Sequence, residues 1–287
     1  TDARLTRWTS PRMGEIVPSP PARRETAPVI SLAADDARLL IDEVHGGRLA
    51  SLVVHGRELL VTAAPDRSPM EWGSYPMVPF AGRIRGGRFE FDGSPVSVPA
   101  DFGGHAIHGY GYLSAWTADA VSDRRATIST TLGAPWPFGG TAAQTVELTD
   151  RSLACTLSVT AGPMAMPAQV GWHPWFAKPD ALGFVAARMY RRDDAYIATA
   201  ESVDVPPGPW DDCFTDVEQP VTLAWGDLTV ELRSDCTDWV VYDQPQHATC
   251  VEPQSGPPDG FTLAPHRLAP GETLTRQFEL RWLPPSG

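Results

Sequence analysis

The sequence predicts an all-β protein with the architecture of a large antiparallel β-sandwich. The chain of 287 residues contains 25 glycines and 29 prolines, scattered so that few uninterrupted stretches are long enough for a helix. Between them lie short segments in which apolar and polar residues alternate, a pattern typical of half-buried strands. Because β-sandwiches of this length often form one unit, we expect an N-terminal arm at 1–28 and a single domain at 29–287.

Composition and charge narrow the class of partner. The formal net charge of −12 gives no cationic field for a nucleic acid or an anionic membrane surface, and it fits a small neutral ligand better. No apolar run approaches the ~18 residues of a membrane-spanning helix, and residues 1–28 lack the apolar core of a signal peptide. A cytoplasmic location is therefore expected, while the oligomeric state stays open.

The cysteines point to reduced thiols. The four residues, Cys155, Cys213, Cys236 and Cys250, show no CxxC spacing, which indicates neither a zinc site nor a disulfide framework. Around Cys155, the residues Leu153, Leu157 and Val159 fall on the same side of a predicted strand. We therefore expect Cys155 in the core.

Strand candidates run along the chain from residue 37, with a turn at Gly46-Gly47 and a hairpin turn at Asp92-Gly93. They are 37–44, 48–56, 57–62, 88–91, 116–121, 126–132, 144–148, 152–160, 183–189, 195–198, 228–232, 239–242, 248–252 and 274–282. In the last, apolar and polar residues alternate as in a half-buried strand. The prolines of 205–216 predict a stiff loop, which would carry Asp211 and Asp212.

Glu252 is the first candidate for proton transfer. It ends an apolar strand and precedes a proline-rich turn, so stiff backbone would hold its carboxylate at a rim. Partial burial beside Val251 and Phe261 would raise its pKa toward the range of a general base. The alternative is a surface carboxylate at the end of a strand.

Histidines supply the second kind of candidate. His173 lies in the aromatic segment 171–176, and an imidazole in a partly dry setting suits a general acid because its unperturbed pKa is ~6.5. The alternative is a core histidine with satisfied hydrogen bonds. His105 and His108 stand three residues apart, but no third histidine, cysteine or carboxylate lies at ligand spacing. We therefore do not expect a metal site.

Arg83 is a candidate for binding a ligand. It follows the small residues Ala81 and Gly82, which would let its guanidinium reach into a cleft and bond bidentately to hydroxyls or carboxylates. Arg85 and Arg88 are expected to face solvent.

Asp211 and Asp212 stand beside Trp210, a combination typical of carbohydrate recognition. Carboxylates accept hydrogen bonds from sugar hydroxyls while an aromatic face packs on C–H groups. Two carboxylates would also suit a glycosidase. The candidates here are each associated with histidine or arginine instead, which favours proton transfer over glycosyl transfer.

In chain order these segments resemble the aldose 1-epimerase (mutarotase) family of the galactose mutarotase-like superfamily, over about residues 38–283. The resemblance is carried by Gly82-Arg83-Ile84, Gly86-Gly87-Arg88-Phe89, Asp92-Gly93, Ile107-His108-Gly109, Trp116, Gly171-Trp172-His173-Pro174-Trp175-Phe176, Asp211-Asp212-Cys213-Phe214, Val251-Glu252-Pro253-Gln254 and Pro258-Asp259-Gly260-Phe261. Each motif is weak alone, and their shared order makes the resemblance specific.

The resemblance implies a supersandwich fold and a cofactor-free interconversion of the α and β anomers of a free sugar. It implies that Glu252 takes the proton of the C1 hydroxyl and that His173 protonates the ring oxygen. The ring then opens, the C1–C2 bond rotates, and closure on the other face reverses the proton transfers. The remaining candidates, Arg83, His108, Asp211 and Trp175, take sugar-binding roles.

Departures from the family pattern leave the substrate open. Typical galactose mutarotases carry an asparagine in place of Gly82 and a glycine in place of Tyr110. A branch that acts on hexose 6-phosphates has an arginine where this chain has Tyr112, so Arg85 or Arg88 would have to supply the phosphate contact. A non-catalytic sugar-binding or regulatory protein on the same fold is the other alternative. A lyase or glycosidase is disfavoured because the chain offers no additional catalytic domain.

Overall fold

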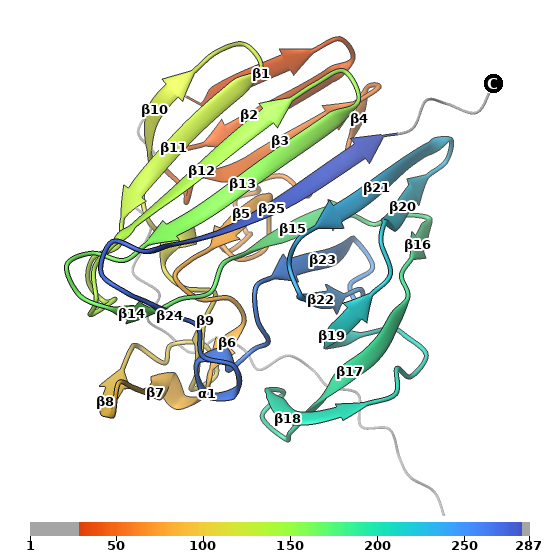
Figure 1. Cartoon of the computed structure of the whole chain (residues 1–287). Coiled ribbons are helices and arrows are strands. Elements are labelled where there is room, and N and C mark those ends of the chain that lie inside the picture. The colour runs from red at the N-terminus through yellow and green to blue at the C-terminus, as the bar shows by residue number, and fades with distance from the viewer. Residues whose placement is uncertain (1–28, 283–287) are drawn as a thin grey trace, which may run out of the picture.

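The computed structural model describes residues 29–282, which form two large antiparallel sheets (Figure 1). The 11-stranded sheet runs in the order β1-β2-β3-β5-β15-β23-β22-β19-β17-β18, with β4 paired to β3, and the 8-stranded sheet runs β10-β11-β12-β13-β25-β21-β20-β16. The prediction of an antiparallel β-sandwich is confirmed. The predicted arm at 1–28 lies outside the described residues, and the division of the chain into an arm and one domain stays a prediction.

The larger sheet consists of β1 (Ile30–Ala34), β2 (Ala37–Asp42), β3 (Arg48–Val54), β4 (Arg57–Glu58), β5 (Ser74–Met77), β15 (Gly171–Ala177), β17 (Ala186–Arg192), β18 (Ala198–Val203), β19 (Asp211–Val217), β22 (Asp238–Tyr242) and β23 (Ala248–Gln254). The smaller sheet consists of β10 (Thr117–Val121), β11 (Arg125–Thr131), β12 (Thr141–Leu148), β13 (Ser152–Thr160), β16 (Ala181–Gly183), β20 (Val221–Trp225), β21 (Leu228–Ser234) and β25 (Thr273–Trp282).

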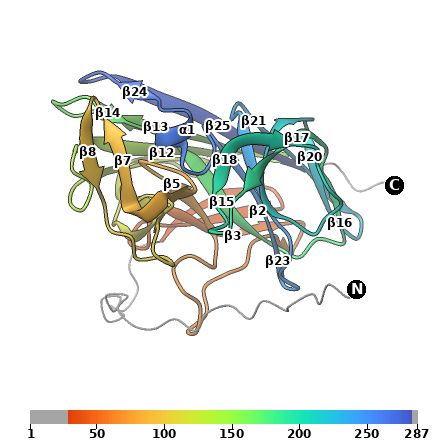
Figure 2. The same ribbon diagram turned by 90° about the horizontal axis from the view of Figure 1, so that it is seen from below.

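Three short two-stranded ribbons and three single turns of helix complete the secondary structure of the described residues. The ribbons pair β6 (Arg83–Ile84) with β9 (Ala106–Ile107), β7 (Arg88–Phe91) with β8 (Ser94–Ser97), and β14 (Met166–Pro167) with β24 (Arg267–Leu268). The turns are η1 (Arg85–Gly87), η2 (Gly111–Leu113) and α1 (Gly260–Leu263). In both views β7, β8, β14 and β24 lie at the same end of the sandwich (Figures 1 and 2).

Several local predictions can be compared with these elements. Asp92 and Gly93 have left-handed backbones (φ 48° and 75°) and close the β7–β8 hairpin, as predicted. Burial alternates along β13, and Cys155 lies in the core. The predicted loop at 205–216 is wrong in its second half, because β19 begins at Asp211. From there the backbone pairs with β17 on one side and β22 on the other, and these ladders outweigh the turn tendency of aspartate.

All four cysteines are buried and unpaired. No helix within the described residues is long and apolar enough to cross a membrane.

The sheets share a core into which one face of β15 points. Trp172 packs its ring 5.5 Å from that of Phe278 on β25. Gln144 on β12 is fully buried between the sheets, where its Nε2 donates to the Gly47 carbonyl at 2.9 Å and its Oε1 accepts from Trp172 Nε1 at 2.9 Å. A buried amide of this kind is favourable only while both partners are present.

A second apolar cluster lies on the other face of the large sheet. Its members come from β5, β15, β23 and the loops that cover them: Val61, Trp72, Tyr75, Met77, Ala81, Tyr112, Trp175, Ala248 and Cys250. Because β15 and β23 are buried on both faces, their sequences, GWHPWFA and ATCVEPQ, lack the alternation of a half-buried strand.

The Gln144 bridge gives a test of the core. Gln144→Met keeps the length of the side chain but leaves the Trp172 indole N–H and the Gly47 carbonyl buried without a partner. We expect a loss of about 2–4 kcal/mol in the free energy of unfolding, measured by urea denaturation. The exposed Gln277→Met on β25 is the matched control, with an expected change within about 0.5 kcal/mol. Equal effects of the two substitutions would contradict the bridge.

Candidate active site

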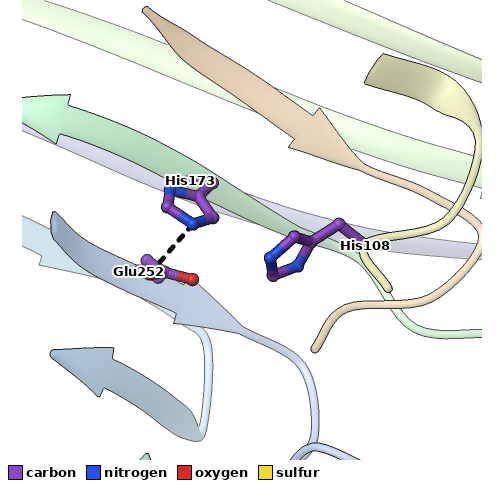
Figure 3. A group of neighbouring side chains, drawn as sticks. All are labelled: His108, His173 and Glu252. Atoms are coloured by element: carbon purple, nitrogen blue, oxygen red, sulfur yellow. Dashed lines mark ion pairs between the residues drawn. The ribbon is translucent and has the colours of Figure 1, made fainter. Parts of the chain in front are cut away.

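The centre of the site is a contact between His173 and Glu252 on the second face of the large sheet. His173 pairs across the ladder with Tyr75 on β5. The pairs Gly171–Gln254 and Trp175–Cys250 bring it opposite Glu252 on β23. His173 Nε2 lies 3.3 Å from Glu252 Oε1, and both side chains are almost completely buried (Figure 3). The ladder therefore joins two residues that are far apart in sequence.

His108 reaches this pair from the segment that follows β9. Its backbone is left-handed (φ 57°), as is that of Gly109 (φ 68°). A Cβ on Gly109 would lie 2.0 Å from the Val78 carbonyl oxygen, so only glycine fits. The His108 N–H donates to the Gly82 carbonyl at 2.8 Å. This turn directs the imidazole at the edge of His173, with ring centroids 4.9 Å apart (Figure 3).

Arg83 lies on the ribbon next to His108, since β6 pairs with β9. Its Nη1 donates to the Tyr196 carbonyl at 2.9 Å, and its guanidinium lies 5.6 Å from the Phe102 ring centroid. Burial lowers the pKa of Arg83, while Asp211 and Glu252 oppose that change. The guanidinium is thus within electrostatic reach of both carboxylates.

Asp211 approaches from β19, where it pairs in register with Tyr242 on β22. Arg192 Nη1 lies 3.4 Å from its Oδ2. Burial raises the pKa of Asp211, and Arg192 and Arg83 oppose the rise. Asp211 is half-buried, as a residue at the mouth of a site would be.

Trp175 forms a wall of the site. Its ring stacks on His173 with centroids 5.4 Å apart and planes 9° apart, and its other side stacks on His247 at 6.2 Å. Only 7% of its surface is exposed. Its Nε1 is buried without a hydrogen-bond partner among the described residues, so it is available as a donor.

Two other residues that the sequence suggests for the site, His105 and Asp212, have their partners outside the central pair. His105 Nδ1 accepts a hydrogen bond from the Gly86 N–H at 3.0 Å, which braces the turn after β6. Asp212 Oδ1 lies 2.7 Å from Arg192 Nε. The structure therefore brings together His108, His173 and Glu252, with Arg83, Asp211 and Trp175 around them, and leaves His105 outside.

Tyr75 and Tyr196 were not identified from the sequence. Tyr75 is fully buried and stacks on His173 with centroids 4.8 Å apart. Tyr196 belongs to the turn between β17 and β18 and supplies the carbonyl that Arg83 binds. Neither has a local motif, because both contacts depend on pairing and packing between distant segments.

Burial dominates the electrostatics of the central pair. It raises the pKa of the Glu252 carboxyl well above its ordinary value, Asp211 raises it further, and Arg83 opposes. It lowers the pKa of His173 to about 3. Both shifts favour the uncharged forms, so a proton shared across the contact is held more strongly by Glu252 than by His173. Because the two groups are coupled, that proton belongs to the pair.

The same three side chains could hold a metal ion, which sequence spacing did not indicate. Donor atoms of His108, His173 and Glu252 all lie within 4.8 Å of one another. Ligands of a tetrahedral zinc ion with ~2.1 Å bonds stand only ~3.4 Å apart. The side chains would therefore have to close around an ion, and the described geometry suits a pair of proton carriers better.

Comparison with known proteins agrees with this fold. The family model described as aldose 1-epimerase matches residues 29–281. The chain belongs to the aldose 1-epimerase family. Among curated proteins, it is similar to the uncharacterized protein YphB of Escherichia coli K-12, with 32% identity over 105 residues, and the match spans 36% of each chain.

Solved structures of similar proteins share the family fold. A putative aldose 1-epimerase from Escherichia coli K12 is 21% identical, with a TM-score of 0.80 over 89% of this chain and 98% of that one. A galactose mutarotase-like protein from Clostridium acetobutylicum is 18% identical, with a TM-score of 0.77 over 88% and 94%. A galactose 1-epimerase from Lactobacillus acidophilus NCFM is 15% identical, with a TM-score of 0.74 over 88% and 93%. At these identities the similarity shows that this member of the aldose 1-epimerase family shares the fold of those proteins.

The buried imidazole of His108 gives a test through the pH dependence of stability. Burial lowers the pKa of His108 well below its ordinary value, and His173 and Arg83 lower it further. Below about pH 6.5 the unfolded chain therefore binds a proton at this residue that the folded chain does not. The resulting loss of stability in acid approaches about 1.4 kcal/mol per pH unit.

We expect His108→Asn, which tolerates the left-handed backbone, to remove this contribution. Urea unfolding at about pH 7.5 and about pH 5.5 measures the difference. The unfolding free energy of the variant should fall less steeply toward acid than that of the wild type. Identical slopes would show that His108 is not buried in its neutral form.

Proposed function

We propose that this protein is an aldose 1-epimerase that interconverts the α and β anomers of a free aldose. The observation that carries the proposal is the buried contact of 3.3 Å between His173 and Glu252. Anomer exchange removes one proton from the C1 hydroxyl, adds one to the ring oxygen, and later reverses both transfers. A dry pair that holds one proton suits this reaction, because one partner is then an acid and the other a base.

In the proposed mechanism the proton of the pair first passes from Glu252 to His173 across their contact. The Glu252 carboxylate then takes the proton of the C1 hydroxyl, and the His173 imidazolium delivers a proton to the ring oxygen. Burial supports both roles. A carboxylate whose pKa is raised binds a proton more strongly, and an imidazolium whose pKa is lowered gives one up more readily. After the ring opens and the C1–C2 bond rotates, the same groups return the protons as the ring closes on the other face.

The surrounding residues would hold the sugar during these steps. His108 and Arg83 flank the pair and offer donors to the ring oxygen and neighbouring hydroxyls, which would stabilise developing negative charge. Asp211 would accept hydrogen bonds from hydroxyls at the mouth. Trp175 would present its free N–H and limit access of water to His173. No step requires a metal or an organic cofactor, and a cytoplasmic location stays a prediction.

Contacts at the rim favour an uncharged sugar over a hexose 6-phosphate. Arg85, one of the two arginines considered for a phosphate, is engaged by Asp193 at 2.5 Å and lies 3.6 Å from Asp259. Arg88, the other, is exposed on β7. Arg192 is engaged by Asp211 and Asp212.

The central prediction concerns Glu252→Gln, which keeps the shape of the side chain and removes the base. We expect the catalysed rate of anomer exchange to fall by at least about 10²-fold, with the sugar still bound. Polarimetry or NMR exchange on a panel of free aldoses measures the rate, and calorimetry measures binding. The exposed Glu90→Gln on β7 is the matched control and should retain full activity. An unchanged rate in Glu252→Gln would refute this assignment, and a wild-type protein that binds sugar without accelerating exchange would be a non-catalytic binder.

Substrate charge gives a second test. Since carboxylates already engage Arg85 and Arg192, a phosphate bound beside them would meet like charge. We expect kcat/KM for a free hexose to exceed that for its 6-phosphate by about 10-fold or more, measured by NMR anomer exchange at matched concentrations. A preference for the phosphorylated sugar would favour the hexose-6-phosphate alternative.

A further inference from the structure

Arg48, at the start of β3, is a buried cation that the proposed chemistry does not yet use. It is fully buried and donates to four backbone carbonyls, those of His45, Pro69, Trp72 and Tyr112. No carboxylate forms an ion pair with it among residues 29–282. A buried charge without an ionic partner is costly, so its place in the fold calls for an explanation.

Arg48 begins a column of stacked side chains that leads to the catalytic pair. Its Cζ lies 4.1 Å from the Trp72 ring centroid and 5.3 Å from that of Tyr75. Tyr75 stacks on His173 at 4.8 Å, and His173 stacks on Trp175 at 5.4 Å. The imidazole of His173 is therefore held between two rings, with a cation behind the inner one.

Two glycines make this packing possible. Gly46 has φ +92°, and a Cβ there would lie 2.2 Å from the Tyr112 carbonyl oxygen. Gly73 has φ +71°, and its Cβ would lie 2.7 Å from the Leu49 carbonyl oxygen and 3.2 Å from Arg48 Cδ. The backbone thus closes around the guanidinium on both sides, which holds it in one place.

We propose that Arg48 is a positioning residue for the His173–Glu252 pair. It acts through Tyr75, whose ring it holds against His173, and its charge makes the His173 imidazolium give up its proton more readily. This inference rests on the proposed function of that pair. Arg48 does not touch the sugar.

The sign of the effect follows from the geometry. The separations of 5.3 Å and 4.8 Å place the guanidinium within about 10 Å of the imidazole. At that distance and an effective dielectric constant of about 20, a positive charge lowers the pKa of a neighbouring group by on the order of one pH unit. Arg48 lowers the pKa of His173 in this sense, after the larger effect of burial.

Other charges face the same elements and stay in place when Arg48 is changed. The titratable and charged groups around Arg48 are Asp42, Tyr75 and Tyr112. Those around the pair are Arg83, His108, Asp211, Tyr75, Cys213 and Cys250. A shift of the pH–rate profile in a variant that lacks Arg48 therefore reports the loss of the Arg48 charge.

The experiment compares Arg48→Gln, which removes the charge, with Arg48→Lys, which keeps it. Removing the cation raises the pKa of His173, so the limb of the pH–rate profile that reports on His173 should move up by about one pH unit in Arg48→Gln. Its kcat should fall by about 10–100-fold because the imidazole is less well held. Arg48→Lys should retain the position of the limbs and more of the rate. Lower rates in both variants with unmoved limbs would overturn the proposal, because a merely structural role gives that result.

A second measurement needs no neutral variant and covers the case in which Arg48→Gln does not fold. ¹⁵N NMR of the histidine side chains in the wild type and in Arg48→Lys should show His173 neutral at pH 7, with one fixed tautomer in both. A cationic or averaging His173 in the wild type would overturn the proposal. These spectra do not depend on activity. If the wild type accelerates no sugar, the proposed function fails, while an averaging His173 ring in the spectra would separately contradict positioning by Arg48.

Discussion

The pairing of β15 with β23 is the constraint on which the candidate site depends. Side chains alternate between the two faces of a strand, so a slip of one residue would turn His173 into the core and Trp172 into the site. Such a slip is strongly opposed, because both faces of both strands are buried. Trp172 and its contacts with Phe278 and Gln144 hold the register from the core side. The packing of the sandwich thereby sets the distance between the proposed acid and base.

The second apolar cluster turns this register into an unusual electrostatic setting. Covering the outer face of the sheet removes water from His173 and Glu252, and burial then favours their neutral forms. Two cations stand on either side of the pair, Arg48 behind Tyr75 and Arg83 toward the mouth. The negative charge of Asp211 counteracts the effect of burial, which lowers the pKa of Arg83. The position of the proton between His173 and Glu252 therefore depends on burial together with the charges of these neighbouring side chains.

Much of the fold could be predicted because half-buried strands leave a periodic signal. The alternation in β13 and in β25, and the Asp92-Gly93 turn, depend on neighbours in the chain and on one buried face. The doubly buried β15 and β23 carry no alternation, and their candidates were recognised by motif instead. At β19 the turn preference of aspartate was misleading, because pairing on both sides decides the structure there.

The site could be predicted only in part, for a related reason. Motifs identified His108, His173 and Glu252, but their approach to within 4.8 Å results from folding, so spacing in the sequence could not indicate a shared metal or proton site. Tyr75 and Arg48 contribute through a stack of rings and through backbone carbonyls. Such contacts impose no pattern on the residues next to them, which is why sequence reasoning missed both.

The two halves of the site differ in how firmly the fold determines them. His173 and Glu252 lie on central strands, whereas Arg83 lies on a ribbon of two-residue strands, His108 directly follows that ribbon, and Tyr196 lies on a hairpin turn. His108 depends on a left-handed backbone and on Gly109, whose close approach to Val78 excludes any larger residue. Segments of this kind change more readily than paired central strands. The chemistry would then be a property of the sandwich, and the choice of sugar would reside in the loops that meet over it.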